Sequence, residues 1–139
     1  MDPFIRNYSI ALGIIVLIVL GVLFYEPAEV RMLNKVLSEN TELTAYPYRF
    51  RVLEFENGSA TLSTPRTQKF NAFRALRILF PSLANEDDSS RRLYDAQLEL
   101  ARVQELAATT VLGQPEVDRV RWKLDERWLR NNGIDPDLL

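Results

Sequence analysis

The stretch YPYRFRVLEFENGSATLST, residues 46–64, predicts a β-hairpin. In its first half, aromatic and aliphatic side chains alternate with arginines, which is the two-residue period of a half-buried strand. The period slips by one residue near Val52, so we expect a β-bulge there. Asn57-Gly58 is a strong signal for a two-residue turn, because both turn positions need positive φ. The second strand is expected over residues 59–64.

Helical patterns lie on both sides of this hairpin. Their apolar side chains recur every three or four residues, and caps or prolines mark their ends. The four predicted helices cover residues 28–40, 65–80, 89–112 and 115–132. Only Gly113, Gln114 and Pro115 separate the last two, so we expect an antiparallel helical hairpin at the end of the chain. The predicted fold class is α+β, with one β-hairpin and about four helices in a small domain over residues 26–139.

A second informative stretch, YSIALGIIVLIVLGVLFY, covers residues 8–25 and contains no charged side chain. As a helix it would rise about 27 Å, close to the hydrocarbon thickness of a bilayer. A cleaved signal peptide would need small residues just before the cut, and the following VLFYEPAEV lacks such a site. We therefore expect a retained transmembrane helix, preceded by a short tail over residues 1–7.

The orientation of this span depends on few charges. Arg6 and the terminal amine lie on its N-terminal side, whereas Arg31 and Lys35 follow it, so the basic residues are nearly balanced. A short basic tail is easily retained in the cytoplasm. We therefore expect an exported domain.

The residue inventory excludes most familiar catalytic chemistry. The 139 residues include no Cys and no His, which removes thiol nucleophiles, thiolate metal sites and histidine bases. The acidic residues 86–88 lack the spacing of a calcium loop and predict a helix-capping segment instead. With a net charge of −2, nucleic-acid binding is not expected either. We expect no metal, no cofactor and no enzymatic activity.

One predicted helix is basic, and no acidic residue occurs between Pro65 and Asn85. At about 100° per residue, one side of it would carry four residues that could contact lipid headgroups. These residues are Arg66, Phe70, Arg74 and Arg77. The alternative is that the helix packs on the hairpin while its arginines are solvated or paired with acids.

The last predicted helix has two apolar sides. Its core side would carry four residues at helical spacing, namely Val117, Val120, Leu124 and Trp128. Trp122 and Leu129 would then lie together on the opposite side. Either the domain buries them by placing the helix between the hairpin and another helix, or they form an exposed contact for a protein partner.

The stretches YPYRFRVLEFENGSATLSTPR, ALRILFP and VRWKLDERWLRNNGI resemble a group of short, N-terminally anchored proteins of gammaproteobacteria, whose role is unassigned. Some of these proteins carry the label glutamate-ammonia-ligase adenylyltransferase. That activity would need a Gly-Ser turn followed about ten residues later by an Asp-x-Asp pair that holds magnesium. Gly58-Ser59 is present, but no Asp occurs between Ser59 and Glu86, so the activity is not expected. The resemblance implies the bacterial inner membrane as location, and the expected export of the domain would place it in the periplasm.

Three functions are compatible with the sequence. The first is a non-catalytic interaction or assembly protein, anchored in the inner membrane as a single-pass subunit beside a larger membrane complex. The second is a small membrane-tethered enzyme without His or Cys chemistry. The third is a domain that binds lipid headgroups through the basic helix.

Overall fold

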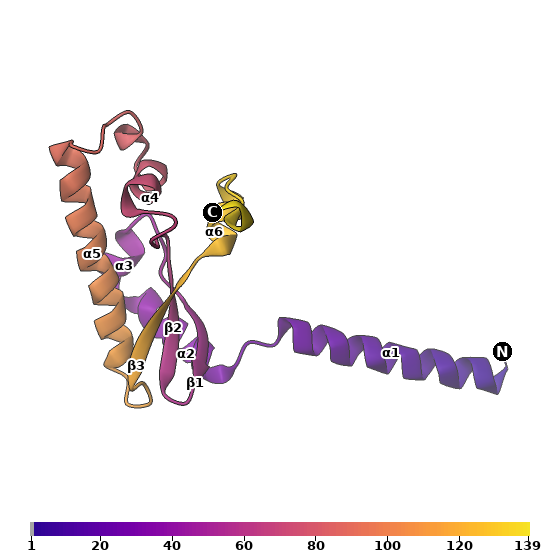
Figure 1. Cartoon of the computed structure of the whole chain (residues 1–139). Coiled ribbons are helices and arrows are strands. Elements are labelled where there is room, and N and C mark those ends of the chain that lie inside the picture. Colours follow the sequence, from indigo (N-terminus) through magenta and orange to yellow (C-terminus); the bar gives the residue numbers. More distant parts are fainter. Residues whose placement is uncertain (1) are drawn as a thin grey trace.

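The N-terminal apolar segment forms one continuous helix, α1 (Pro3–Phe24), in the computed structural model, which describes residues 2–139. The Asp2 side chain caps its first turn by accepting a hydrogen bond from the Phe4 amide, so most of the predicted tail over residues 1–7 is helical. No residue of α1 is buried, and the helix extends away from the rest of the protein (Figure 1). It is long and apolar enough to cross a membrane, a property that signal sequences share.

The first part of the domain is helical. After residues 25–27 comes α2 (Ala28–Glu39), as predicted, and then the short helix α3 (Thr41–Ala45). Asn40 separates the two helices, because its side chain accepts hydrogen bonds from the first free amides of α3. The buried residues of α2 follow its three- and four-residue period, and they are Val30, Leu33 and Leu37.

The predicted hairpin is confirmed. Strands β1 (Val52–Glu56) and β2 (Ser59–Thr64) pair antiparallel, and their register shifts between Val52 and Glu54 as expected for a bulge. Asn57 and Gly58 both have positive φ, at 50° and 76°. This turn matches the right-handed twist of the two strands.

The prediction of a helix over residues 115–132 is wrong, and so is the antiparallel helical hairpin. Residues Arg119–Leu124 form strand β3, which runs parallel to β2 in a three-stranded sheet of order β1-β2-β3. The sequence RVRWKL alternates strictly between basic and apolar side chains, and this two-residue period suits a strand. Pairing with the edge of β2 then satisfies backbone groups that a hairpin alone would leave open. Only α6 (Glu126–Asn131) is helical in this region.

The helix predicted over residues 65–80 is also too long. Helix α4 (Ala72–Leu79) begins only after Asn71, whose side chain accepts a hydrogen bond from the Arg74 amide. Thr64 ends β2 instead of capping a helix, and the segment between is turned on itself by hydrogen bonds between Thr67 and Phe70. Part of the predicted segment is helical, but Asn71 caps the helix better than Thr64 does, so α4 begins only after Asn71.

The return from β2 to β3 passes through the longest helix of the domain. A 3-10 turn (Pro81–Leu83) follows α4, and α5 (Arg91–Leu112) then begins at Ser90, close to the predicted start. Its length carries the chain back to the start of β3, which a parallel strand pair requires. A last 3-10 turn (Pro136–Leu138) ends the chain.

The main core lies between one face of the sheet and the helices α2 and α5 (Figure 1). Because side chains alternate along a strand, the register places apolar residues of all three strands on this face. They are Val52 and Phe55 of β1, Ala60 and Leu62 of β2, and Val120 and Trp122 of β3. A smaller cluster joins α4 to α6 and contains Phe70, Ala75 and Leu129.

Substituting Gly58 by alanine should destabilise the protein more than the same change at Gly133. Gly58 and Gly133 have φ values of 76° and 78°, so either alanine is strained by about 1–2 kcal/mol. At Gly58 an added Cβ would also collide with the Asp118 carboxylate, whereas at Gly133 it meets open space. Thermal denaturation of the full chain in mild nonionic detergent measures the difference. Adding Asp118→Ala to both glycine variants should remove most of the difference in stability between them. If Gly58→Ala and Gly133→Ala lost equal stability, the collision with Asp118 would be contradicted.

Candidate functional site

The two edges of the sheet differ within residues 2–139, because a side chain pairs with the first residue of β1 and no comparable partner lies along β3. At the β1 edge, the Asn34 side chain donates to the carbonyl oxygen of Val52 at 3.0 Å and accepts from its amide at 2.6 Å. At the other edge, β3 has no strand neighbour except β2 within residues 2–139. An open edge offers unpaired backbone donors and acceptors to another extended chain.

The alternation of β3 shows which backbone groups lie at this open edge. The amide of Arg119 donates to Gly58 of the hairpin turn, and the amide of Asp125 donates to Thr64 at the end of β2. Since successive residues of a strand point their backbone groups to opposite sides, the even-numbered residues of β3 face away from β2. Val120, Trp122 and Leu124 therefore present their N–H and C=O groups at the open edge.

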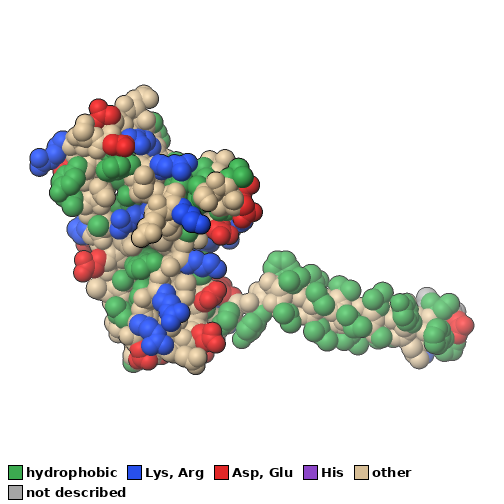
Figure 2. All heavy atoms as spheres, in the orientation of Figure 1, with side chains coloured by type: hydrophobic (Ala, Val, Ile, Leu, Met, Phe, Trp, Pro, Cys, Tyr) green, Lys and Arg blue, Asp and Glu red, His purple; other side chains and the backbone are tan. Residues whose placement is uncertain are grey.

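Charged side chains gather on the face of the sheet opposite the core. The register places Arg119, Arg121 and Lys123 in a row along β3, beside the hydroxyl side chains of β2. Glu54 and Glu56 occupy the far strand of the same face. Figure 2 shows Lys and Arg side chains along β3 and acidic side chains over the hairpin beside them.

The basic row of β3 has no ion-pair partner within residues 2–139. All three of its side chains are exposed, and none of them forms an ion pair with any residue of the described chain. The whole protein, by contrast, has a net charge of −2. The open edge is therefore a locally basic surface on a slightly acidic protein.

Trp122 and Leu129, which the sequence placed on one side of a helix, lie in different environments. Trp122 is part of β3, is 37% exposed, and meets Phe50 edge-to-face with ring centroids 6.1 Å apart. Leu129 belongs to α6 and is fully buried beside Phe70. Because the helical period does not apply to β3, the shared apolar side does not exist. Trp122 remains a candidate partner contact, and Leu129 is a core residue.

The four residues predicted to contact headgroups are not on one helix face either. Arg66 and Phe70 precede α4, and Phe70 is fully buried. Arg66 donates to Gln104 through Nε at 3.3 Å, and Arg77 donates to the Glu86 carbonyl and pairs with Asp88. Of the four, only Arg74 is exposed, and its guanidinium lies 4.6 Å from the centroid of the Phe70 ring.

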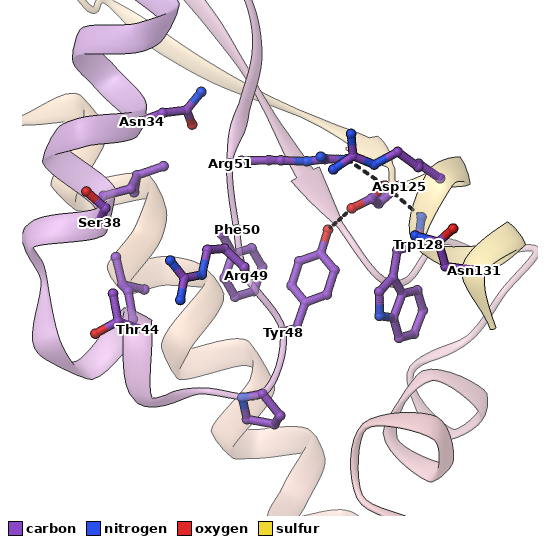
Figure 3. A pocket seen from close by; sticks show the side chains of 14 residues that line it. Asn34, Ser38, Thr44, Tyr48, Arg49, Phe50, Arg51, Asp125, Trp128 and Asn131 are labelled. Atoms are coloured by element: carbon purple, nitrogen blue, oxygen red, sulfur yellow. Dashed lines mark hydrogen bonds and ion pairs between the residues drawn. The ribbon is translucent and has the colours of Figure 1, made fainter.

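A pocket of about 550 Å³ lies at the end of the sheet where β1 begins and β3 ends. Its walls come from α2 and α3 on one side, from residues 47–51 in the middle, and from Asp125 and α6 on the other side (Figure 3). Its volume falls within the range typical of small-molecule sites. Apolar side chains in its lining include Leu37, Leu43, Pro47 and Trp128, and the charged ones are Arg49, Arg51, Asp125 and Arg127.

Asp125 is the centre of a hydrogen-bond network in this pocket. Its side chain is 6% exposed and accepts from the Tyr48 hydroxyl at 2.8 Å and from the Arg51 guanidinium at 2.9 Å. It also caps α6 by accepting from the Trp128 amide at 3.1 Å. Burial raises the pKa of Tyr48 far above its ordinary value, so its hydroxyl keeps the proton that it donates. Figure 3 shows Tyr48 and Arg51 both directed at Asp125.

Two cations of the pocket lack an ion pair. Arg49 and Arg127 are exposed, and neither pairs with an acidic side chain of residues 2–139. Arg51 is paired with Asp125, but its buried Nε has no hydrogen-bond partner in the described chain. The arrangement can therefore attract and orient an anion. No group of His, Cys, Asp and Glu within the described residues is suited to hold a metal ion.

Sequence reasoning missed both the open edge and the pocket. The alternation of RVRWKL indicates a strand, but the same apolar residues also fit the three- and four-residue spacing of a helix. Asp125 followed by Glu126 is a recognisable helix start. No local signal could have paired Asp125 with Tyr48, which is 77 residues away along the chain.

Comparison with known proteins finds no protein family, no curated relative and no solved structure that matches this chain. The resemblance to anchored gammaproteobacterial proteins thus depends on the quoted sequence stretches alone.

Replacing Asp125 by alanine should destabilise the protein by about 3 kcal/mol, because it leaves a half-buried arginine, a buried tyrosine hydroxyl and the first turn of α6 without their acceptor. Tyr48→Phe should cost about 1–2 kcal/mol, since the carboxylate keeps its other partners. Chemical denaturation of the full chain in mild detergent measures both losses.

Asp88→Ala is the matched control for this comparison. It also breaks an Arg–Asp pair, but Asp88 is 71% exposed, so the expected loss is under about 1 kcal/mol. If Asp125→Ala were no more damaging than Asp88→Ala, the network would not hold α6 in place.

Proposed function

We propose that this protein is a non-catalytic, single-pass interaction protein of the bacterial inner membrane, whose domain binds a partner protein of the same membrane through the open edge of β3. The observation that carries the proposal is this unpaired strand edge with its unpaired basic row. We further propose that the partner contributes an extended acidic segment, which pairs with β3 as a fourth strand.

The anchoring part of the proposal is supported by α1. A helix whose apolar side chains are exposed on all sides for 22 residues is unfavourable in water, and it needs a lipid or protein environment. The domain itself buries its own core without help from α1. The basic residues on the two sides of the span are nearly balanced, and we place the domain in the periplasm because a short tail that carries Arg6 is easily retained in the cytoplasm.

The binding part is supported by the physics of strand addition. Main-chain hydrogen bonds to the open edge supply affinity, and side chains of alternate residues supply specificity. Arg119, Arg121 and Lys123 would face acidic side chains of an added strand across the outer face. Trp122, on the other face, offers partly exposed aromatic area at the same edge.

The same charges argue against a homodimer through this edge. In an antiparallel pair of two β3 strands, basic side chains of both copies would share one face and repel each other. Basic residues on an edge strand protect proteins from self-association in this way. The row therefore favours an acidic partner over a second copy of the chain.

The anchor predicts a simple fractionation result. The full-length protein should remain in the membrane pellet after alkaline carbonate washing, because α1 would be embedded in the hydrocarbon layer. Protein lacking residues 1–27 should appear in the soluble fraction. N-terminal sequencing of the membrane form is the control. A mature chain that begins near Glu29 would show that α1 is a cleaved signal instead.

Strand addition predicts a specific pattern of amide protection. A synthetic peptide of alternating glutamate and threonine should slow hydrogen exchange at the amides of Val120, Trp122 and Leu124 of the full-length protein in nonionic detergent. The amides of Arg121 and Lys123 already face β2 and should change little. Hydrogen exchange resolved by NMR measures both sets. Equal protection of both sets, or of neither, would contradict strand addition.

Charge variants test the basic row in the same assay. The double change Arg121→Glu and Lys123→Glu should weaken peptide binding at least tenfold, which is about 1.4 kcal/mol. Lys69→Glu with Arg74→Glu makes the same change in net charge at exposed positions before and within α4, and should leave peptide binding unchanged. If this control weakened binding equally, the attraction would depend on overall charge and not on β3. If the protein bound anionic vesicles and only the control variant lost this binding, the result would instead support the headgroup hypothesis.

A further inference from the structure

We propose that the pocket between α2, residues 47–51 and α6 binds a small anionic molecule with an apolar body, such as a carboxylate or phosphate attached to an aromatic or aliphatic group. This site is separate from the open edge of β3. It would give the anchored domain a ligand in addition to its protein partner.

The shape and lining of the pocket suit an apolar body. Leu37 and Leu43 line it from the side of α2 and α3, while Pro47 and Trp128 supply a proline ring and an indole. Trp128 is fixed by an edge-to-face contact with Tyr48, with ring centroids 5.6 Å apart. A rigid aromatic surface inside a pocket of about 550 Å³ favours a flat or short-chain ligand.

The charges of the pocket favour an anion. Among its lining residues are three arginines and one acid. That acid, Asp125, is occupied, because both of its carboxylate oxygens accept hydrogen bonds within the protein. Arg49 and Arg127 remain without an acidic partner within residues 2–139. A cationic ligand would meet two uncompensated positive charges, and an anionic one would neutralise them.

The position of Arg51 gives the site a preorganised donor. Its pair with Asp125 holds the guanidinium in place, while the buried Nε has no hydrogen-bond partner in the described chain. A buried donor without an acceptor costs free energy comparable to a lost hydrogen bond. Arg51 lines the pocket, so an anion bound there would lie beside a guanidinium that is already held in place and loses little side-chain entropy on binding.

The test uses the fluorescence of Trp128, which lines the pocket, to report ligand binding. The protein contains two tryptophans, so Trp122→Phe leaves Trp128 as the single one. Phenyl phosphate and phenylacetate are titrated into this full-length variant in nonionic detergent, and the fluorescence of Trp128 is followed. We expect a saturable change with both anions and at least tenfold weaker binding of the neutral analogue phenylacetamide. Inorganic phosphate should also bind at least tenfold more weakly than phenyl phosphate, because it lacks the apolar body.

Point variants locate the site. Arg127→Gln and Arg49→Gln should each weaken phenyl phosphate at least fivefold, since each removes one uncompensated cation from the lining. Arg130→Gln is the matched control, because Arg130 lies on the same helix but pairs with Glu126 and does not line the pocket. Circular dichroism melting checks that each variant is folded.

Several results would overturn the proposal. These are the absence of a saturable signal with either anion, equal binding of phenylacetamide, or equal loss in all three arginine variants. Equal binding of inorganic phosphate would show attraction by charge alone and would reject an apolar ligand. The outcome is independent of strand addition, because the acidic peptide is scored at the amides of β3 and these probes are scored at Trp128.

Discussion

The domain depends on the buried carboxylate of Asp125. This side chain joins three parts of the chain that are far apart in sequence, because it accepts from Tyr48, from Arg51 and from the first turn of α6. Its own amide continues the pairing of β3 with β2 by donating to Thr64. The end of the third strand, the start of the last helix and the segment that leads into the hairpin are thus fixed at one point. Both candidate surfaces, the open edge of β3 and the pocket, take their geometry from this junction.

The two edges of the small sheet differ at the residue where β1 begins. At β1, Asn34 imitates a neighbouring strand, because its amide group both donates to and accepts from Val52. At β3 the polar groups of the backbone are left open and basic side chains stand beside them. A side chain that pairs with an edge residue in this way hinders the addition of another strand, and the structure shows no such side chain along β3 within residues 2–139. The difference between the edges is why we regard β3 as a surface for binding.

The sequence predicted the local features of the fold and missed those that depend on long-range pairing. The turn at Asn57-Gly58, the bulge after Val52 and the long helices all follow from short-range signals, and the structure has them. In residues 115–132 two periods competed, since Val120 and Leu124 fit both a helix and a strand. The edge of β2 decided between them, and no sequence pattern states that this edge is available. Trp122 and Leu129 were separated for the same reason, and the network of Asp125 had no local signal at all.

The segment between α1 and α2 is only three residues long, 25–27, and ends in Pro27. Fully extended, three residues span about 10 Å, so a domain anchored by α1 could not move far from the lipid surface. A partner in the same membrane would then meet it in a thin layer and not in the whole volume of the compartment. The effective concentration of the two proteins would be high, and an interaction that is weak in solution could keep them associated. A short and easily reversed edge pairing, of the kind that six residues of β3 offer, would be sufficient under such confinement.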